Sequence, residues 1–176
     1  PNTDKIYLLN RIYDNKKKNN IINLLKKYNN KFVEIPFKLD DYLNINYNNE
    51  IDILIKENLR NKKLLELIKE HNLYLINNNG SRNYCINYGK KNNYDWIFPL
   101  DSNSFFTDKY FNKILKIIQS HKNLDYLIIP QIRIKDLNIQ NKEIFLNKDK
   151  LDKLKINEPQ IAFHKNSKLL FNENIP

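Results

Sequence analysis

The clearest chemical signal in the sequence is an acidic segment that follows the apolar run 96–100 and contains Asp101 and Asn103. A carboxylate at the end of a buried strand can bind a divalent metal, and Mg²⁺ commonly uses one or two carboxylates while it holds phosphate oxygens. Asn103 can add an amide oxygen to such a site. The alternative is that Asp101 caps a helix near residues 105–110. We therefore predict a sparse Mn²⁺ or Mg²⁺ site at Asp101 and Asn103, with the helix cap as the competing interpretation.

A second polar segment contains Arg82 and Asn83 and follows a turn over residues 77–80. Ser81 is suited to cap a helix there, and Gly89 is suited to end that helix in a left-handed C-cap. Backbone amides at the start of a helix, together with a guanidinium group, suit a phosphate. A surface Arg paired with a carboxylate is the alternative. The segment therefore predicts a phosphate contact at Arg82 and Asn83.

Two residues near the end of the chain can take part in catalysis or metal binding. Glu158 precedes Pro159, which holds the backbone of Glu158 out of helical conformations. A carboxylate held in this way can serve as a general base, or it can be a solvated loop residue. His164 is either a metal ligand or a satisfied polar group at the end of a strand. We predict the base at Glu158 and include His164 among the metal ligands.

The elements that must position these residues follow an alternating pattern. Helices are expected over residues 15–28 with Asp14 as cap, over 59–71, and after Thr107 or Asp108. Strands are expected near residues 5–9, 32–35, 73–76, 95–100 and 125–133, with shorter ones near 161–164 and 169–171. Strands alternating with helices favour a mostly parallel sheet, and ligands of such sheets bind outside the carboxyl ends of the strands. The predicted site therefore requires that residues 95–100 form a central strand of the sheet.

The composition limits the function classes. A chain of 176 residues with 41% hydrophobic residues is expected to form one domain, and the sequence contains no apolar run long enough to span a membrane. The net charge of +10 favours an anionic partner, although dispersed lysines and scarce arginines also fit a general bias toward Lys and Asn. No clustered basic stripe or motif supports nucleic-acid binding. One Cys excludes an intramolecular disulfide, and we expect a cytoplasmic protein.

The central segments resemble the GT-A class of glycosyltransferases, particularly the family-2-like branch. Those proteins carry an N-x-G-x-x-x-R-N pattern and later an apolar strand that ends in D-x-D. The corresponding segments here are residues 78–83, which read Asn-Asn-Gly-Ser-Arg-Asn and have one residue between Gly and Arg where the pattern has three, and residues 96–103. The chain is similar also to a little-characterised GT-A-like set with N-G-x-x-R-N and W-x-x-P-x-D-G-N-x-F-x-T segments. In this chain the second segment is 96–107, and an E-P-Q-I-A-F stretch follows at 158–163.

The resemblance implies a fold and a donor site. The expected fold is a single GT-A-like (Rossmann-like) α/β domain over residues 1–176, truncated at its C-terminus, with a central, mainly parallel sheet and helices on both faces. Arg82 and Asn83 would lie by the diphosphate of a nucleotide-sugar donor, and Asp101 would hold the metal. Asn10 and Arg11 would border the nucleotide. These five side chains are expected to converge on one cleft of positive potential.

The implied activity is metal-assisted transfer of a sugar from the nucleotide-sugar to an unknown glycan or protein acceptor. The nucleotide-sugar-binding residues would also include Glu34, in the second expected strand. Two departures matter: Asn103 replaces the second acidic residue of the motif, and Ser102 replaces the Gly of the closer set. The alternative function is a GT-A-like binding or accessory domain without turnover.

Overall fold

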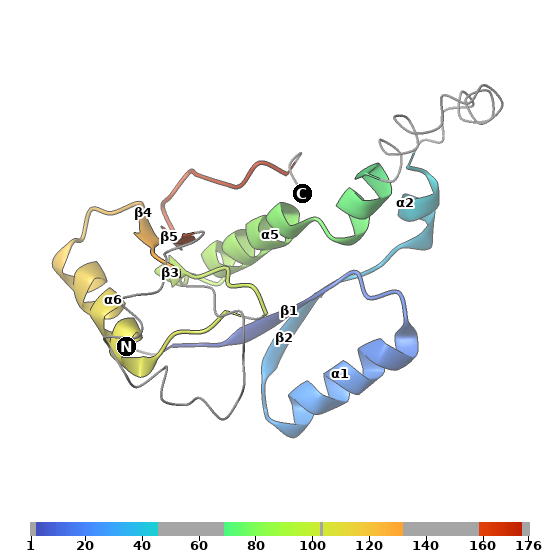
Figure 1. Ribbon diagram of the computed structural model, residues 1–176, viewed down its shortest axis with the longest axis horizontal. Helices are drawn as coiled ribbons and strands as arrows, with labels where there is room; N and C mark the ends of the chain where they lie inside the picture. The colour runs from blue at the N-terminus through green and yellow to red at the C-terminus, as the bar shows by residue number, and fades with distance from the viewer. Residues whose placement is uncertain (1–2, 46–68, 103, 132–158, 174–176) are drawn as a thin grey trace. The chain divides into compact units, whose positions relative to one another are not determined.

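The computed structural model describes residues 3–45, 69–102, 104–131 and 159–173 (Figure 1). The chain divides into two compact units, which are described separately. The first unit comprises Pro1–Asn83 with Phe171–Pro176, and the second comprises Tyr84–Leu170. No helix among the described residues combines the length and the apolar character needed to cross a membrane.

The first unit begins with a β-α-β arrangement. Its elements are β1 (Ile6–Asn10), α1 (Asn15–Lys27) and β2 (Lys31–Ile35), and the two strands pair in parallel from Ile6↔Lys31 to Asn10↔Ile35 (Figure 1). The Asp14 carboxylate caps α1 by accepting a hydrogen bond from the Lys17 N–H at 3.0 Å. Leu9 of β1 and Leu25 of α1 are both buried. The predicted strands 5–9 and 32–35, the helix and its cap are confirmed to within a residue or two.

The segment 73–76 is not the strand that we predicted. Residues 69–75 are helical, and they follow the short helix α2 (Leu39–Leu43) in the described part of the chain. Tyr74 explains the outcome, because its ring packs against Phe37 and Tyr42 with centroid distances of 6.1 and 5.9 Å. A four-residue apolar run fits a buried helical turn as well as a strand, and the tertiary contacts decide between them.

Helix α5 (Asn78–Lys91) begins and ends differently from the prediction. It starts at Asn78, because the preceding Asn77 has a left-handed backbone (φ 23°) and its Oδ1 accepts a hydrogen bond from the Gly80 N–H at 2.7 Å. Ser81 is therefore inside the helix and is not the cap. Gly89 is also inside it, without a positive φ. A Cβ at Gly89 would lie 2.3 Å from Cγ1 of Ile97, so glycine is required for the close approach of the helix to this residue.

The second unit is built on an antiparallel sheet. Its elements are β3 (Trp96–Ile97), helix α6 (Asp108–Ser120), β4 (Tyr126–Ile129) and β5 (Gln160–His164), and the strand order is β3-β5-β4. The predicted cap at Thr107 is confirmed, since its Oγ1 accepts from the Tyr110 N–H at 3.5 Å. One core cluster contains Ile114, Ile129 and Ala162, with Trp96 and other large apolar residues packed against it.

The predicted central, mainly parallel, Rossmann-like sheet is wrong. The described residues form a two-stranded parallel sheet and a separate three-stranded antiparallel sheet. The cause is β5, which pairs antiparallel with both β3 and β4 and so takes the central place in the second sheet. The segment 95–100 contributes only Trp96–Ile97, at an edge of that sheet as described. The argument that placed Asp101 at the tip of a central strand therefore loses its basis.

Candidate anion-binding site

The first unit brings Asn10 and Arg11 together at the carboxyl end of β1. The Asn10 Nδ2 donates to the carbonyl of Ile76 at 2.8 Å, and the Asn10 Oδ1 accepts from Nη1 of Arg11 at 3.0 Å. The Arg11 N–H donates to the carbonyl of Ile35 at 2.8 Å, which continues the β1–β2 ladder by one residue. Arg11 has a left-handed backbone with φ 44°. A non-glycine residue rarely adopts this conformation, and such conformations cluster at functional sites.

The guanidinium group of Arg11 is held on a second side by an aromatic ring. Its Cζ lies 4.9 Å from the ring centroid of Tyr74, a cation–π contact. The Tyr74 ring is itself fixed, because its hydroxyl donates to the carbonyl of Lys38 and accepts from the Lys38 N–H, both at 3.1 Å. Among the described residues, Arg11 forms no ion pair with a carboxylate. Arg11 is thus an oriented cation with no acidic partner in the described part of the chain.

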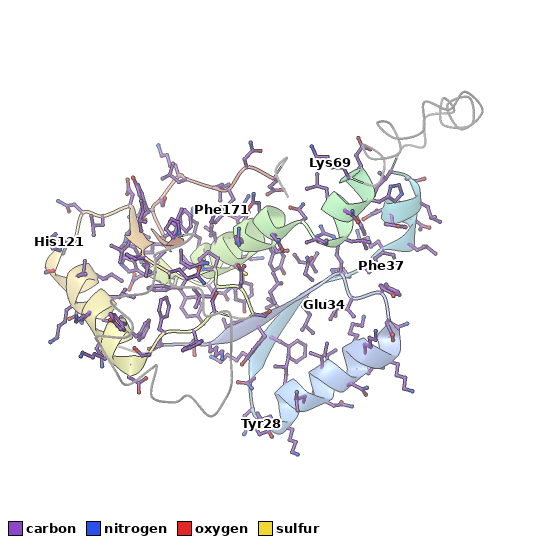
Figure 2. All side chains as sticks on the ribbon, viewed as in Figure 1. Tyr28, Glu34, Phe37, Lys69, His121 and Phe171 are labelled. Atoms are coloured by element: carbon purple, nitrogen blue, oxygen red, sulfur yellow. The ribbon has the colours of Figure 1, made fainter. Side chains whose placement is uncertain are left out.

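Glu34 also belongs to the first unit, on the strand next to β1 (Figure 2). Its Oε1 lies 3.0 Å from Nζ of Lys18, and both side chains are about three-quarters buried. This ion pair joins β2 to α1. Glu34 thus has a structural role, and the nucleotide contact predicted for it would come in addition to this ion pair.

Arg82 and Asn83 lie on α5, where they contact the end of the chain instead of an open surface. Asn83 is buried, and its amide is hydrogen-bonded to Phe171 and Glu173. Arg82 has its guanidinium carbon 5.4 Å from the ring centroid of Phe171, which Figure 2 labels, and its Nη1 donates to Asn79 at 3.1 Å. Both residues thus belong to the first unit together with Arg11, but their amide and guanidinium groups are engaged with the chain itself.

The remaining predicted site residues belong to the second unit or lie outside the described residues. Asp101 is an exposed residue of the second unit, and its carbonyl accepts from the Ser104 N–H at 2.9 Å. His164 also belongs to the second unit; its ring lies edge-on to Trp96, with centroids 5.5 Å apart. Asn103 and Glu158 lie outside the described residues. Their predicted roles, and the convergence of the five donor-site residues on one cleft, stay predictions.

The structure describes only Asp101 and His164 of the predicted metal site. Asp101 offers one exposed carboxylate, and Nδ1 of His164 accepts a hydrogen bond from the Asn166 N–H at 3.3 Å within its own turn. Over residues 3–45, 69–102, 104–131 and 159–173, no three His, Cys, Asp or Glu side chains are grouped so that they could hold a metal. The metal at Asp101 therefore stays a prediction, and the function proposed below has no metal-bound step.

Sequence reasoning missed the residues that hold the predicted ones in place. Tyr74 was assigned to a strand, so its contact with Arg11 was not expected. Asn79 was assigned to a turn, and Phe171 was assigned to a short strand. One feature of the sequence could have predicted these contacts. The chain has few arginines and many aromatic residues, and Arg preferentially stacks on aromatic faces.

Comparison with known proteins gives no match for this chain: no protein-family model, no curated protein and no solved structure is significantly similar to it.

Proposed function

We propose that this chain binds the diphosphate part of a nucleotide-sugar donor through its first unit and transfers the sugar to a glycan or protein acceptor. The observation that carries the proposal is the Arg11 guanidinium at the carboxyl end of the parallel β1–β2 pair, held by Asn10 and Tyr74. Ligands of parallel strands bind at that end, and a planar guanidinium suits phosphate oxygens. The resemblance of residues 78–83 and 96–107 to glycosyltransferase segments supplies the reaction class.

Each residue of this site has a distinct part in the proposal. Arg11 neutralises the diphosphate of the donor and the negative charge that builds on it as the sugar leaves. Asn10 keeps the guanidinium oriented through its Oδ1, and the ring of Tyr74 supports the opposite side. Such fixed groups stabilise developing charge better than mobile ones, because they need no reorganisation during the reaction. Glu158 is the proposed base for the acceptor hydroxyl.

The second candidate is a nucleotide-sugar-binding module without turnover. It is favoured by Asn103, which stands where the acidic motif has its second carboxylate. Both candidates require donor binding at Arg11, and they differ only in product formation. A Glu158→Gln variant separates them: under the enzymatic proposal it binds donor normally and its turnover falls by roughly 10²–10⁴-fold. The cytoplasmic location expected from the sequence is part of either proposal and is tested by fractionation.

The direct test is calorimetric titration of the chain with UDP, GDP and dTDP, with and without Mn²⁺, beside a short DNA duplex. We expect one nucleotide to bind better than the duplex, and Arg11→Ala to weaken it by on the order of 10–100-fold, as for loss of a charge-assisted hydrogen bond. Arg11→Lys restores the charge without the planar fork and is expected to recover only part of the affinity.

The matched control is Lys26→Ala, which removes one positive charge from the last turn of α1. This variant should bind nucleotide as the unaltered chain does. Equal losses in the Arg11 and Lys26 variants would show that net charge alone attracts the nucleotide, and the proposed site would be wrong.

A further inference from the structure

The amide nitrogen of Asn83 has both of its donor hydrogens used by residues 171–173. Its Nδ2 donates to the Phe171 carbonyl at 2.9 Å and to Oε1 of Glu173 at 2.8 Å, and its Oδ1 accepts from the Phe171 N–H at 2.8 Å. An amide nitrogen has two hydrogens to donate, and both are used. Asn83 is also only 3% exposed. It cannot contact a ligand while Phe171 and Glu173 remain in place.

Two further side chains of α5 hold the same short segment. The Asn79 Nδ2 donates to the carbonyl of Asn172 at 2.9 Å, and the guanidinium of Arg82 stacks on the ring of Phe171. Residues 171–173, called the strap here, are thus held one by one by side chains from a single helix. Most of these contacts go to the strap backbone, so the helix surface holds the segment through its main chain as well as its side chains.

One contact shows what kind of ligand could replace the strap. The carboxylate of Glu173 places an anionic oxygen on the Asn83 amide. It lies on the same helix surface as Arg82, whose guanidinium the aromatic ring of the strap covers. Displacing the strap would therefore uncover the face of the Arg82 guanidinium that Phe171 covers, while Nη1 still donates to Asn79, and would release the amide donors of the adjacent Asn83. That pair suits phosphate oxygens.

We propose that the strap is an autoinhibitory segment that competes with the donor diphosphate for Arg82 and Asn83. This inference deepens the proposed function and rests on it, because the ligand is the diphosphate of the same donor. The strap makes the site available only in the fraction of molecules in which it has left α5. The observed affinity is then lower than the intrinsic affinity by that fraction.

The test changes the strap and leaves α5 intact. The unaltered chain and a Phe171→Ala/Glu173→Gln variant are titrated calorimetrically with inorganic pyrophosphate. If the strap is open in about a tenth of the molecules, weakening it tightens pyrophosphate binding by up to roughly 10-fold. Glu70→Gln is the matched control, because it removes one negative charge from an exposed residue of the same unit. Affinity in the strap variant that is equal to or weaker than in the Glu70 variant overturns the proposal.

A second measurement uses the unaltered chain, so it does not depend on how the variant folds. The Phe171 N–H is hydrogen-bonded to Asn83, and its hydrogen exchange reports opening of the strap. Pyrophosphate should accelerate exchange at this amide. Slower exchange would mean that the strap closes over the ligand, and competition would be excluded.

The two proposals can fail separately. If the Arg11→Ala change weakens nucleotide binding but strap variants leave pyrophosphate affinity unaltered, the proposed function stands and the strap is structural. If strap variants bind pyrophosphate more tightly but nucleotides bind no better than pyrophosphate, the strap proposal stands and the nucleotide-sugar function falls.

Discussion

The two compact units use their charged groups differently. In the first unit, Arg11 is oriented by a neutral amide and an aromatic ring, and no described carboxylate neutralises it. In the second unit, Lys165 lies 2.8 Å from the Asp95 carboxylate and 3.1 Å from Oδ1 of Asn93. The charge of Lys165 is thus satisfied by a segment about 70 residues away in sequence within the same unit. An oriented cation without an acidic partner can still bind an anion, whereas Lys165, like Lys18 in its ion pair with Glu34 of the first unit, makes a structural contact.

The largest predicted effect concerns the central strand of the second unit. Phe163 of β5 pairs with residues of both neighbouring strands and is 3% exposed. Phe163→Ala should lower the free energy of unfolding by about 3–5 kcal/mol, because it removes a large buried ring and leaves a cavity. Urea denaturation followed by the fluorescence of Trp96, the one Trp of the chain, reports this unit.

Phe105→Ala is the control for that loss. Phe105 belongs to the same unit but is 59% exposed. Its replacement should change the free energy of unfolding by no more than about 0.5 kcal/mol, as is usual for surface positions. Equal losses at Phe163 and Phe105 would contradict the central place of β5.

The next effect concerns the strap in the first unit. Asn83→Ala leaves the N–H and C=O of Phe171 without their partner and should cost about 1–3 kcal/mol, the range for unsatisfied buried polar groups. Asn92→Ala is the control, since its Nδ2 donates to the Tyr88 carbonyl at an exposed position. Thermal unfolding of both variants makes the comparison. A cost at Asn83 no larger than at Asn92 would mean that the strap contributes nothing to stability.

The smallest effect is a pH dependence in the second unit. The hydrogen bond and positive charge of Lys165 lower the pKa of Asp95 below its ordinary value. A carboxyl group with a lowered folded-state pKa contributes stability above its unfolded pKa, and that stability is lost as the pH falls through the folded value. Because Asp95 is exposed, the contribution is small.

Asp95→Asn should therefore destabilise the chain slightly at pH 7 and not at all once the pH is well below about 4, where the carboxyl group is protonated. Asp125→Asn, at another exposed position of this unit, controls for the loss of one negative charge. Unfolding measured from pH 7 to pH 2 checks the prediction. A difference between Asp95→Asn and the unaltered chain that persists at pH 2 would contradict it.

Some local features were predictable from the sequence, whereas the caps of α5 and the pairings between distant segments were not. The caps at Asp14 and Thr107 follow from residue types within one helical turn, and β1, α1 and β2 are consecutive in the chain. The direction of β5 relative to β3 is absent from any local pattern, because it depends on segments far apart in sequence. That is why the sheet was predicted parallel.

The candidate site also combines features that the sequence predicted with features that it did not. The sequence singled out Arg11 and Asn83 as site residues through a family resemblance, and both belong to the first unit. Residue spacing did not show that Tyr74 would be helical and lie against Arg11, or that the Asn83 amide would be hydrogen-bonded to Phe171. Whether a polar side chain is engaged or available depends on which distant segment packs against it. Residue type and spacing alone do not determine this.

The most direct test of the account is to find which unit responds to the donor diphosphate. A ¹⁵N-labelled sample is titrated with UDP, GDP or dTDP, whichever binds best, and amide shifts are followed in both units. The account predicts the largest shifts at Asn10, Arg11 and Ile35, at the carboxyl ends of β1 and β2, and their loss in the Arg11→Ala variant. Largest shifts at Asp101 and its neighbours in the second unit, unchanged by the Arg11 substitution, would contradict it.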